Sequence, residues 1–197
     1  MNMVITSANR YLTQTEMEGN AEFIFGIFYG NGWTINAIAA MLGNMESEST
    51  INPGIYENLN AYSDTNGFGL VQWTPNTKYK SWADENGYGN DYGDILGQVM
   101  RIKYEWQNEI QWIPTDTYNM TFDAFTKSSA PPEELAQAFL YNYERPASLD
   151  QPQRSTQARR WYDFIVSLGG VPPTPTPTEK KEMSKLLLYF AGTKRRF

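Results

Sequence analysis

Apolar residues recur at intervals of three and four along most of the chain, and this spacing strongly limits the folds open to it. The clearest case is the segment 34–45, in which Ile35, Ile38, Leu42 and Met45 fall on one face of a helix. A helix buries such a face against its neighbours. Similar spacing and end signals predict four more helices, over residues 17–29, 94–112, 130–146 and 154–168. The chain is therefore predicted to be mainly α, with a helical bundle-like domain.

One irregular segment interrupts this pattern. Residues 51–73, "INPGIYENLNAYSDTNGFGLVQW", are rich in Asn, Gly and Ser and contain two turn signals, Asn52-Pro53-Gly54 and Asn66-Gly67. We expect a loop with a short β-hairpin here. Because irregular segments held by rigid helices often carry binding and catalytic residues, this excursion is the first candidate for a functional site.

The clearest boundary along the chain is "GGVPPTPTPTEKKE", residues 169–182. Alternating Pro and Thr cannot form a helix or a packed core, so this segment is predicted to be an extended linker. It separates a domain at residues 1–168 from a short tail at 183–197. Residues 179–197 hold six of the 16 Lys and Arg but only two of the 22 Asp and Glu, which leaves ten basic and twenty acidic residues elsewhere. An acidic body argues against nucleic acid as a partner. The basic tail is expected to be an untethered disordered segment, and the alternative is contact with anionic wall polymers or a membrane surface.

The chain contains neither Cys nor His. This excludes disulfides, thiol nucleophiles, Ser-His-Asp triads and the usual zinc ligand sets, so we expect no metal or other cofactor. Any catalysis falls to carboxylates, Lys, Tyr or water. The N-terminus has no signal-peptide pattern, and the apolar run Leu186–Ala191 is too short to cross a bilayer. We therefore expect a soluble protein with no secretory signal and no stable membrane insertion.

Two acids stand at the end of a predicted helix in "GNMESESTINPG", residues 43–54. Acids are disfavoured there because the last carbonyl groups of a helix carry partial negative charge. A rotation of about 100° per residue places Glu46 and Glu48 roughly 200° apart, so they are not a catalytic dyad. Glu48 shares a strip with Met41 and Met45, where loss of hydration favours the proton-bound carboxyl that a general acid needs. The alternative is a solvated glutamate at a fraying helix end. Glu46 is interpreted as a solvent-side or cap-region residue with no assigned chemistry.

Three motifs in order carry a resemblance: "ESTINP" at 48–53, "GFGLVQW" at 67–73 and "LYNYERP" at 140–146. Together they resemble the lysozyme-like superfamily, including goose-type lysozymes and soluble lytic transglycosylases. With the longer stretches "NGWTINAIAAMLGNMESESTINPG" and "GFGLVQWTP", the chain looks more closely like the phage tail lysozyme family, over roughly residues 10–168. The resemblance implies an α+β lysozyme-like fold in which the irregular segment forms one wall of a cleft.

The resemblance also implies site residues. The family's catalytic acid falls on Glu48. The candidates for a second carboxylate come from the irregular segment itself and are Glu57 and Asp64, with Asp64 preferred because it lies in the polar turn before the Gly-Phe-Gly segment. Some branches use no second acid, and a group of the substrate attacks instead. The residues implied to bind substrate are Ser49, Glu57, Phe68, Gln72, Trp73, Asn142, Tyr143 and Glu144. The competing interpretations are a Gly-punctuated hairpin for "GFGLVQW" and an internally packed helix end for "LYNYERP".

The function implied is a muramidase, a bacteriolytic hydrolase that cleaves the MurNAc-GlcNAc β-1,4 linkage of peptidoglycan with a glutamate general acid. A lytic transglycosylase that forms 1,6-anhydro-muramic products is the alternative. A non-catalytic wall-binding or structural tail module is the second alternative. The expected partners are the peptidoglycan glycan strand and other phage tail proteins, and the expected location is the virion tail or the medium after release from the infected cell.

Overall fold

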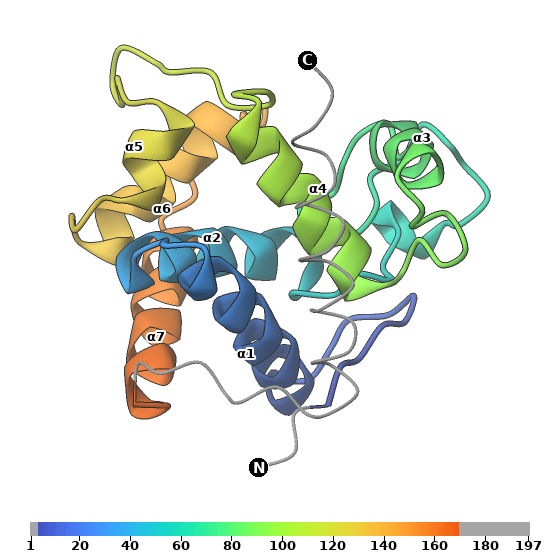
Figure 1. Cartoon of the computed structure of the whole chain (residues 1–197), viewed down its shortest axis with the longest axis horizontal. Helices are drawn as coiled ribbons and strands as arrows, with labels where there is room; N and C mark the ends of the chain where they lie inside the picture. The colour runs from blue at the N-terminus through green and yellow to red at the C-terminus, as the bar shows by residue number, and fades with distance from the viewer. Residues whose placement is uncertain (1–3, 170–197) are drawn as a thin grey trace, which may run out of the picture.

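A computed structural model describes residues 4–169 of the chain. The domain is mainly helical, as predicted, and Figure 1 shows how its helices are arranged. In chain order the elements are α1 (Gln14–Gly30), α2 (Ile35–Ser49), the 3-10 turn η1 (Glu57–Leu59), α3 (Thr77–Glu85), α4 (Ile95–Gln107), α5 (Phe122–Thr126), α6 (Pro132–Phe139), the π-helix η2 (Leu140–Glu144) and α7 (Gln153–Ser167).

The five predicted helices all occur, but their ends differ. Helix α1 begins before the predicted residue 17 because Thr13 and Glu16 form a capping box, in which each side chain accepts a hydrogen bond from the other residue's backbone N–H. Helix α4 stops at Gln107 rather than 112, and the chain turns through residues with positive φ at Glu109 and Gln111. The segment 130–146 is not one regular helix, since α6 continues as the π-helix η2. The short helices α3 and α5 were not predicted.

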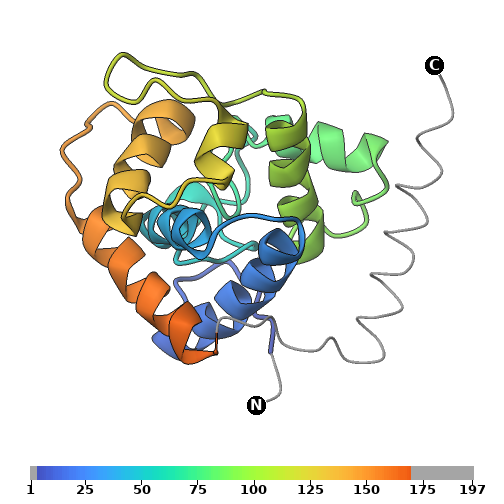
Figure 2. The same ribbon diagram turned by 60° about the vertical axis from the view of Figure 1, so that its left-hand side comes forward.

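The central helix is α2. Figure 2 shows it, in light blue, in the middle of the molecule with α1, α4, α5, α6 and α7 around it. The spacing of its large apolar residues indicated one buried face, but every residue from Ala37 to Met45 is buried. The reason is the small side chains between the large ones, since Ala and Gly let neighbouring helices approach on the other faces. Helices α6 and α7 both pack directly on α2.

The closest approach to α2 is made by α7 at Gly43. A Cβ atom added to Gly43 would lie 2.6 Å from the backbone nitrogen of Ala158 and 2.8 Å from the carbonyl oxygen of Arg154. Both are backbone atoms of α7, so a side chain at residue 43 must push the two helices apart.

We therefore expect Gly43→Ala to lower the free energy of unfolding by about 1–3 kcal/mol, which lowers the Tm by several degrees. The control is Gly30→Ala at the end of α1, where an added Cβ meets nothing within 4 Å. Thermal unfolding followed by circular dichroism measures both. Equal Tm values for the two variants would contradict the tight α2–α7 contact.

The irregular segment after α2 is held by long-range contacts rather than by a sheet. The hairpin expected there reduces to one antiparallel bridge between Tyr56 and Phe68, and no strand occurs in residues 4–169. The turn out of α2 passes through Thr50 and Ile51, both with positive φ. The side chain of Asn52 then bonds to the backbone of residues 8 and 10 in the N-terminal segment. A loop whose backbone is held by such side-chain hydrogen bonds does not need pairing between β-strands.

The predicted linker at 169–182, apart from Gly169, and the predicted tail at 183–197 lie outside the described residues. Within residues 4–169, no helix is both long enough and apolar enough to span a bilayer.

Candidate active site

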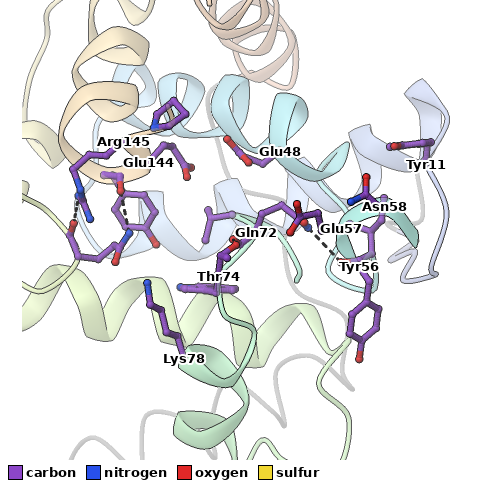
Figure 3. Close-up of a pocket in the computed structure, with 16 residues that line it drawn as sticks. Tyr11, Glu48, Tyr56, Glu57, Asn58, Gln72, Thr74, Lys78, Glu144 and Arg145 are labelled. Carbon is purple, nitrogen blue, oxygen red and sulfur yellow. Dashed lines mark hydrogen bonds between the residues drawn. The ribbon is translucent and has the colours of Figure 1, made fainter. Parts of the chain in front are cut away.

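A cavity of about 540 Å³ opens where the end of α2, the irregular segment and the end of η2 meet. Figure 3 shows the side chains around it. The three sequence motifs each contribute, through Glu48, through Gln72 and Trp73, and through Tyr143 and Glu144. Segments from three distant parts of the chain thus converge on one hollow.

Glu48 lies in the last turn of α2, and its side chain is 20% exposed. Its Oε1 accepts a hydrogen bond of 2.5 Å from Nη2 of Arg154, at the start of α7. The buried guanidinium of Arg154 also donates to Oδ1 of Asn44 at 3.0 Å and to Oε1 of Gln151 at 2.7 Å. With its other donors engaged by these groups, Arg154 holds the Glu48 carboxyl in one position at the cavity. The helical spacing predicted Met41 and Met45 beside Glu48, and the guanidinium of Arg154 was not predicted.

Glu46 has different neighbours and does not line the cavity. Its Oε2 accepts hydrogen bonds from the Arg160 guanidinium and, at 2.8 Å, from Nε1 of Trp161. The side chain is only 12% exposed, so the prediction of a solvent-side residue is wrong. Glu46 stabilises the contact between α2 and α7, whereas Glu48 faces the cavity.

The Gly-Phe-Gly segment forms one wall. Gly69 has a φ of +78°, and a Cβ there would lie 2.4 Å from Oε1 of Gln98. That same oxygen accepts a hydrogen bond of 2.8 Å from the N–H of Leu70. The absence of a side chain at Gly69 therefore allows Gln98 to approach the loop and bind its backbone. Gln72 lines the cavity, while Phe68 is buried behind the wall against Tyr56.

Ser49 connects α2 to this wall and does not line the cavity. Its buried hydroxyl lies 3.0 Å from the carbonyl oxygen of Met45 and 2.9 Å from that of Leu70, and it accepts the N–H of Asn52 at 3.2 Å. The side chain therefore fixes the loop relative to the helix that carries the neighbouring Glu48.

The motif "LYNYERP" forms the opposite wall. Tyr143 lines the cavity, whereas Asn142 is buried and anchors the preceding loop by accepting from the N–H of Thr115 at 3.1 Å and donating to the carbonyl of Tyr118 at 2.8 Å. Glu144 lines the cavity, and its Oε1 is buried with no hydrogen-bond partner among the described residues.

One buried carboxylate joins the two walls. Glu105 of α4 accepts hydrogen bonds from Nε1 of Trp73 at 2.9 Å and from the hydroxyl of Tyr143 at 2.5 Å. Arg101 completes the group with an ion pair of 2.8 Å. Burial raises the pKa of Glu105, an effect that Arg101 and the two hydrogen bonds oppose. Sequence reasoning missed Glu105, although an acid three residues after Ile102 on the apolar face of a helix was an available signal.

The chain matches a known family. A model of the phage tail lysozyme family matches residues 19–165. The chain belongs to the phage tail lysozyme family. It is also similar to morphogenesis protein 1 of Bacillus phage B103, with 51% identity over 163 residues. That match covers 83% of this chain and 44% of the relative, so the chain spans less than half of the relative's length. The family membership predicted from the three motifs is confirmed.

The two candidates for a second carboxylate lie in different places. Glu57 lines the cavity, and its Oε2 accepts the N–H of Gly67 at 2.8 Å. Asp64 does not line it, since its side chain is 79% exposed and pairs with Lys80 at 3.4 Å. The geometry brings Glu57 and not Asp64 to the cavity.

Other residues at the cavity were not predicted. Tyr11 comes from the segment before α1, Lys78 from α3 and Arg145 from the turn after η2. Arg145 has a φ of +50°, and its Nη1 donates to the carbonyl oxygens of Gln111 and Asn142 at 2.5 Å. The first two lie outside the three motifs, so only the folded chain reveals them.

Proposed function

We propose that this domain is a muramidase that cleaves the MurNAc-GlcNAc β-1,4 linkage of peptidoglycan, with Glu48 as the general acid. The observation that carries the proposal is the position of the Glu48 carboxyl, which meets the other two family motifs at one cavity. Membership of the phage tail lysozyme family supports the same reaction. In the reaction, Glu48 protonates the glycosidic oxygen as its bond to the anomeric carbon breaks.

The lining of the cavity suits an N-acetylated sugar. The exposed ring of Tyr11 offers aromatic surface to the apolar face of a pyranose ring, and the side-chain amides of Gln72 and Asn58 offer both donors and acceptors. Tyr143 and Trp73 are held by hydrogen bonds to Glu105, so these walls are set before substrate arrives. Ser49, Phe68 and Asn142 then act behind the cavity surface, by holding the residues that touch the sugar.

The mechanism depends on which residue, if any, supplies a second carboxylate. Glu57 is the candidate within the cavity, while a catalytic role for Asp64 stays a prediction. The exposed position of Asp64 favours one alternative, a lytic transglycosylase, because attack by the substrate's own 6-hydroxyl needs no second acid at that place. The products then end in 1,6-anhydro-muramic acid.

Product analysis in oxygen-18 water tests this proposal. We expect defined peptidoglycan strands to yield reducing MurNAc ends that carry one oxygen-18 atom, as measured by mass spectrometry. Anhydro-muramic ends without oxygen-18 would replace the muramidase with the transglycosylase. The Asp64→Asn variant, tested alongside, decides whether Asp64 takes part, since a catalytic carboxylate is worth about 10²-fold or more in rate.

We also propose that the enzyme acts from the virion tail, with other virion proteins as partners. The support is the family and the similarity to a phage morphogenesis protein. The proposed linker at 169–182 fits such a tethered enzyme. Immunogold labelling of purified virions tests this location, and label confined to lysed-cell medium would contradict it.

A further inference from the structure

Glu144 is a third carboxyl group at the cavity, besides Glu48 and Glu57, and its surroundings favour the neutral form. It is the last residue of the π-helix η2, and its Oε1 is buried with no hydrogen-bond partner among residues 4–169. An ionised carboxylate oxygen in such a place loses its hydration and gains no donor in return. A carboxyl that keeps its proton avoids most of this cost.

The charged groups around Glu144 come from each element packed against it. Glu48 of α2 and Glu105 of α4 bring negative charge, while Arg154 of α7 and the adjacent Arg145 bring positive charge. Burial raises the pKa of Glu144 well above its usual range, Glu48 and Glu105 raise it further, and the two arginines oppose them. The two arginines make their hydrogen bonds to other groups, since Arg154 donates to Glu48 and Arg145 donates to backbone carbonyls.

Glu48 and Glu144 lie close enough to affect one another. Figure 3 shows their side chains reaching into the cavity from α2 and from η2, with the carboxyl ends turned toward each other. Two carboxyl groups that share a site do not both ionise readily, so such a pair retains one proton over a wide pH range. In the free protein the two members differ, since Glu48 has a guanidinium partner and Glu144 has none.

We propose that Glu48 and Glu144 form a carboxyl pair that holds one proton in the cavity, and that Glu144 stores this proton until Glu48 delivers it to the substrate. This inference rests on the proposed function. The proton passes from Glu144 through solvent in the cavity to Glu48, and Glu48 gives it to the glycosidic oxygen as the C–O bond breaks. The water that adds to the anomeric carbon returns one proton to the pair, so the enzyme ends as it began.

The variant that tests whether Glu144 stores the proton is Glu144→Gln. The amide keeps the shape of a neutral carboxyl but has no acidic proton to transfer. We expect kcat on peptidoglycan oligosaccharides at pH 7 to fall about tenfold or more, and the alkaline limb of the pH–kcat profile to move to lower pH by about one unit or more. KM should stay within about twofold, since uniform binding is not altered. Thermal stability at pH 7 should not fall, because the amide replaces a group that is already neutral.

Two further variants make the result specific. Glu144→Asp keeps a titratable carboxyl and should restore the alkaline limb toward the parent position. Glu134→Gln makes the same substitution at an exposed residue of α6 and should match the parent at every pH.

A parent-like kcat and alkaline limb in Glu144→Gln would overturn the proton store. So would a loss of activity that is the same at every pH, because that result indicates a role without proton transfer. Failure of the proposed function has a different signature, since Glu48→Gln would then remain active whatever Glu144→Gln does.

Discussion

Replacing Glu48 with Gln is expected to reduce the clearing of purified cell walls by about 10²- to 10⁴-fold, the usual contribution of a general acid. The amide has the shape of the carboxyl, and its oxygen can still accept from Arg154, so the fold should survive. The loss should therefore appear in kcat, with wall binding retained. Turbidity of cell-wall suspensions measures the rate, and sedimentation with the walls measures the binding.

Glu46→Gln is the matched control for this variant. Glu46 lies two residues earlier on α2, contacts Arg160 and Trp161, and does not line the cavity. We expect its cell-wall clearing to stay near the parent value while its Tm falls slightly, since a charged contact between α2 and α7 is lost. If Glu48→Gln clears walls as fast as the parent, Glu48 is not the acid, and a wall-binding or structural tail module becomes the better account.

Replacing Glu105 with Ala is expected to have the largest effect on stability. The change leaves Arg101 without its buried counter-ion, and it leaves the Trp73 and Tyr143 donors without their shared acceptor. Breaking a buried, hydrogen-bonded ion pair costs about 3–5 kcal/mol, which corresponds to a fall in Tm of about 10 °C. Calorimetry measures this loss. Activity should also decrease at temperatures below the new Tm, where the variant is still folded, because both walls of the cavity lose the group that positions them.

Glu85→Ala removes an exposed acid at the end of α3 and should change stability by no more than about 0.5 kcal/mol. A Tm for Glu105→Ala that matches this control would show that Glu105 does not hold the walls.

The pH dependence of stability gives an independent test of Glu105. Because burial raises its pKa on folding, the folded chain binds more protons than the unfolded chain above the ordinary pKa of a glutamate. The contribution of Glu105 to stability therefore decreases as pH rises from that value through the raised one. Glu105→Gln should make the curve of unfolding free energy against pH flatter over this interval, and an unchanged slope would contradict the assignment.

Local patterns in the sequence were enough to find five of the helices and the motifs, but not α3 and α5. The spacing of Ile35, Ile38, Leu42 and Met45 predicted α2, and Asp94 predicted the start of α4, because helix periodicity and capping depend on residues within one or two turns. The same local patterns predicted the ends of the helices and the structure of the loops less well. The expected hairpin became a single bridge, since side chains such as those of Ser49, Asn52 and Gln98 hold the loop from other parts of the fold.

The sequence by itself determined that the fold is mainly helical, that the chain belongs to a lysozyme family, and that Glu48 stands at a helix end before a polar loop. Only the tertiary structure decided which groups surround that carboxyl. Arg154 lies 106 residues from Glu48 in the chain, and Glu105 lies 32 and 38 residues from Trp73 and Tyr143. Contacts between residues so far apart in the chain produce no local periodicity in the sequence. The protonation and the position of the side chains at the site therefore depend on tertiary packing alone.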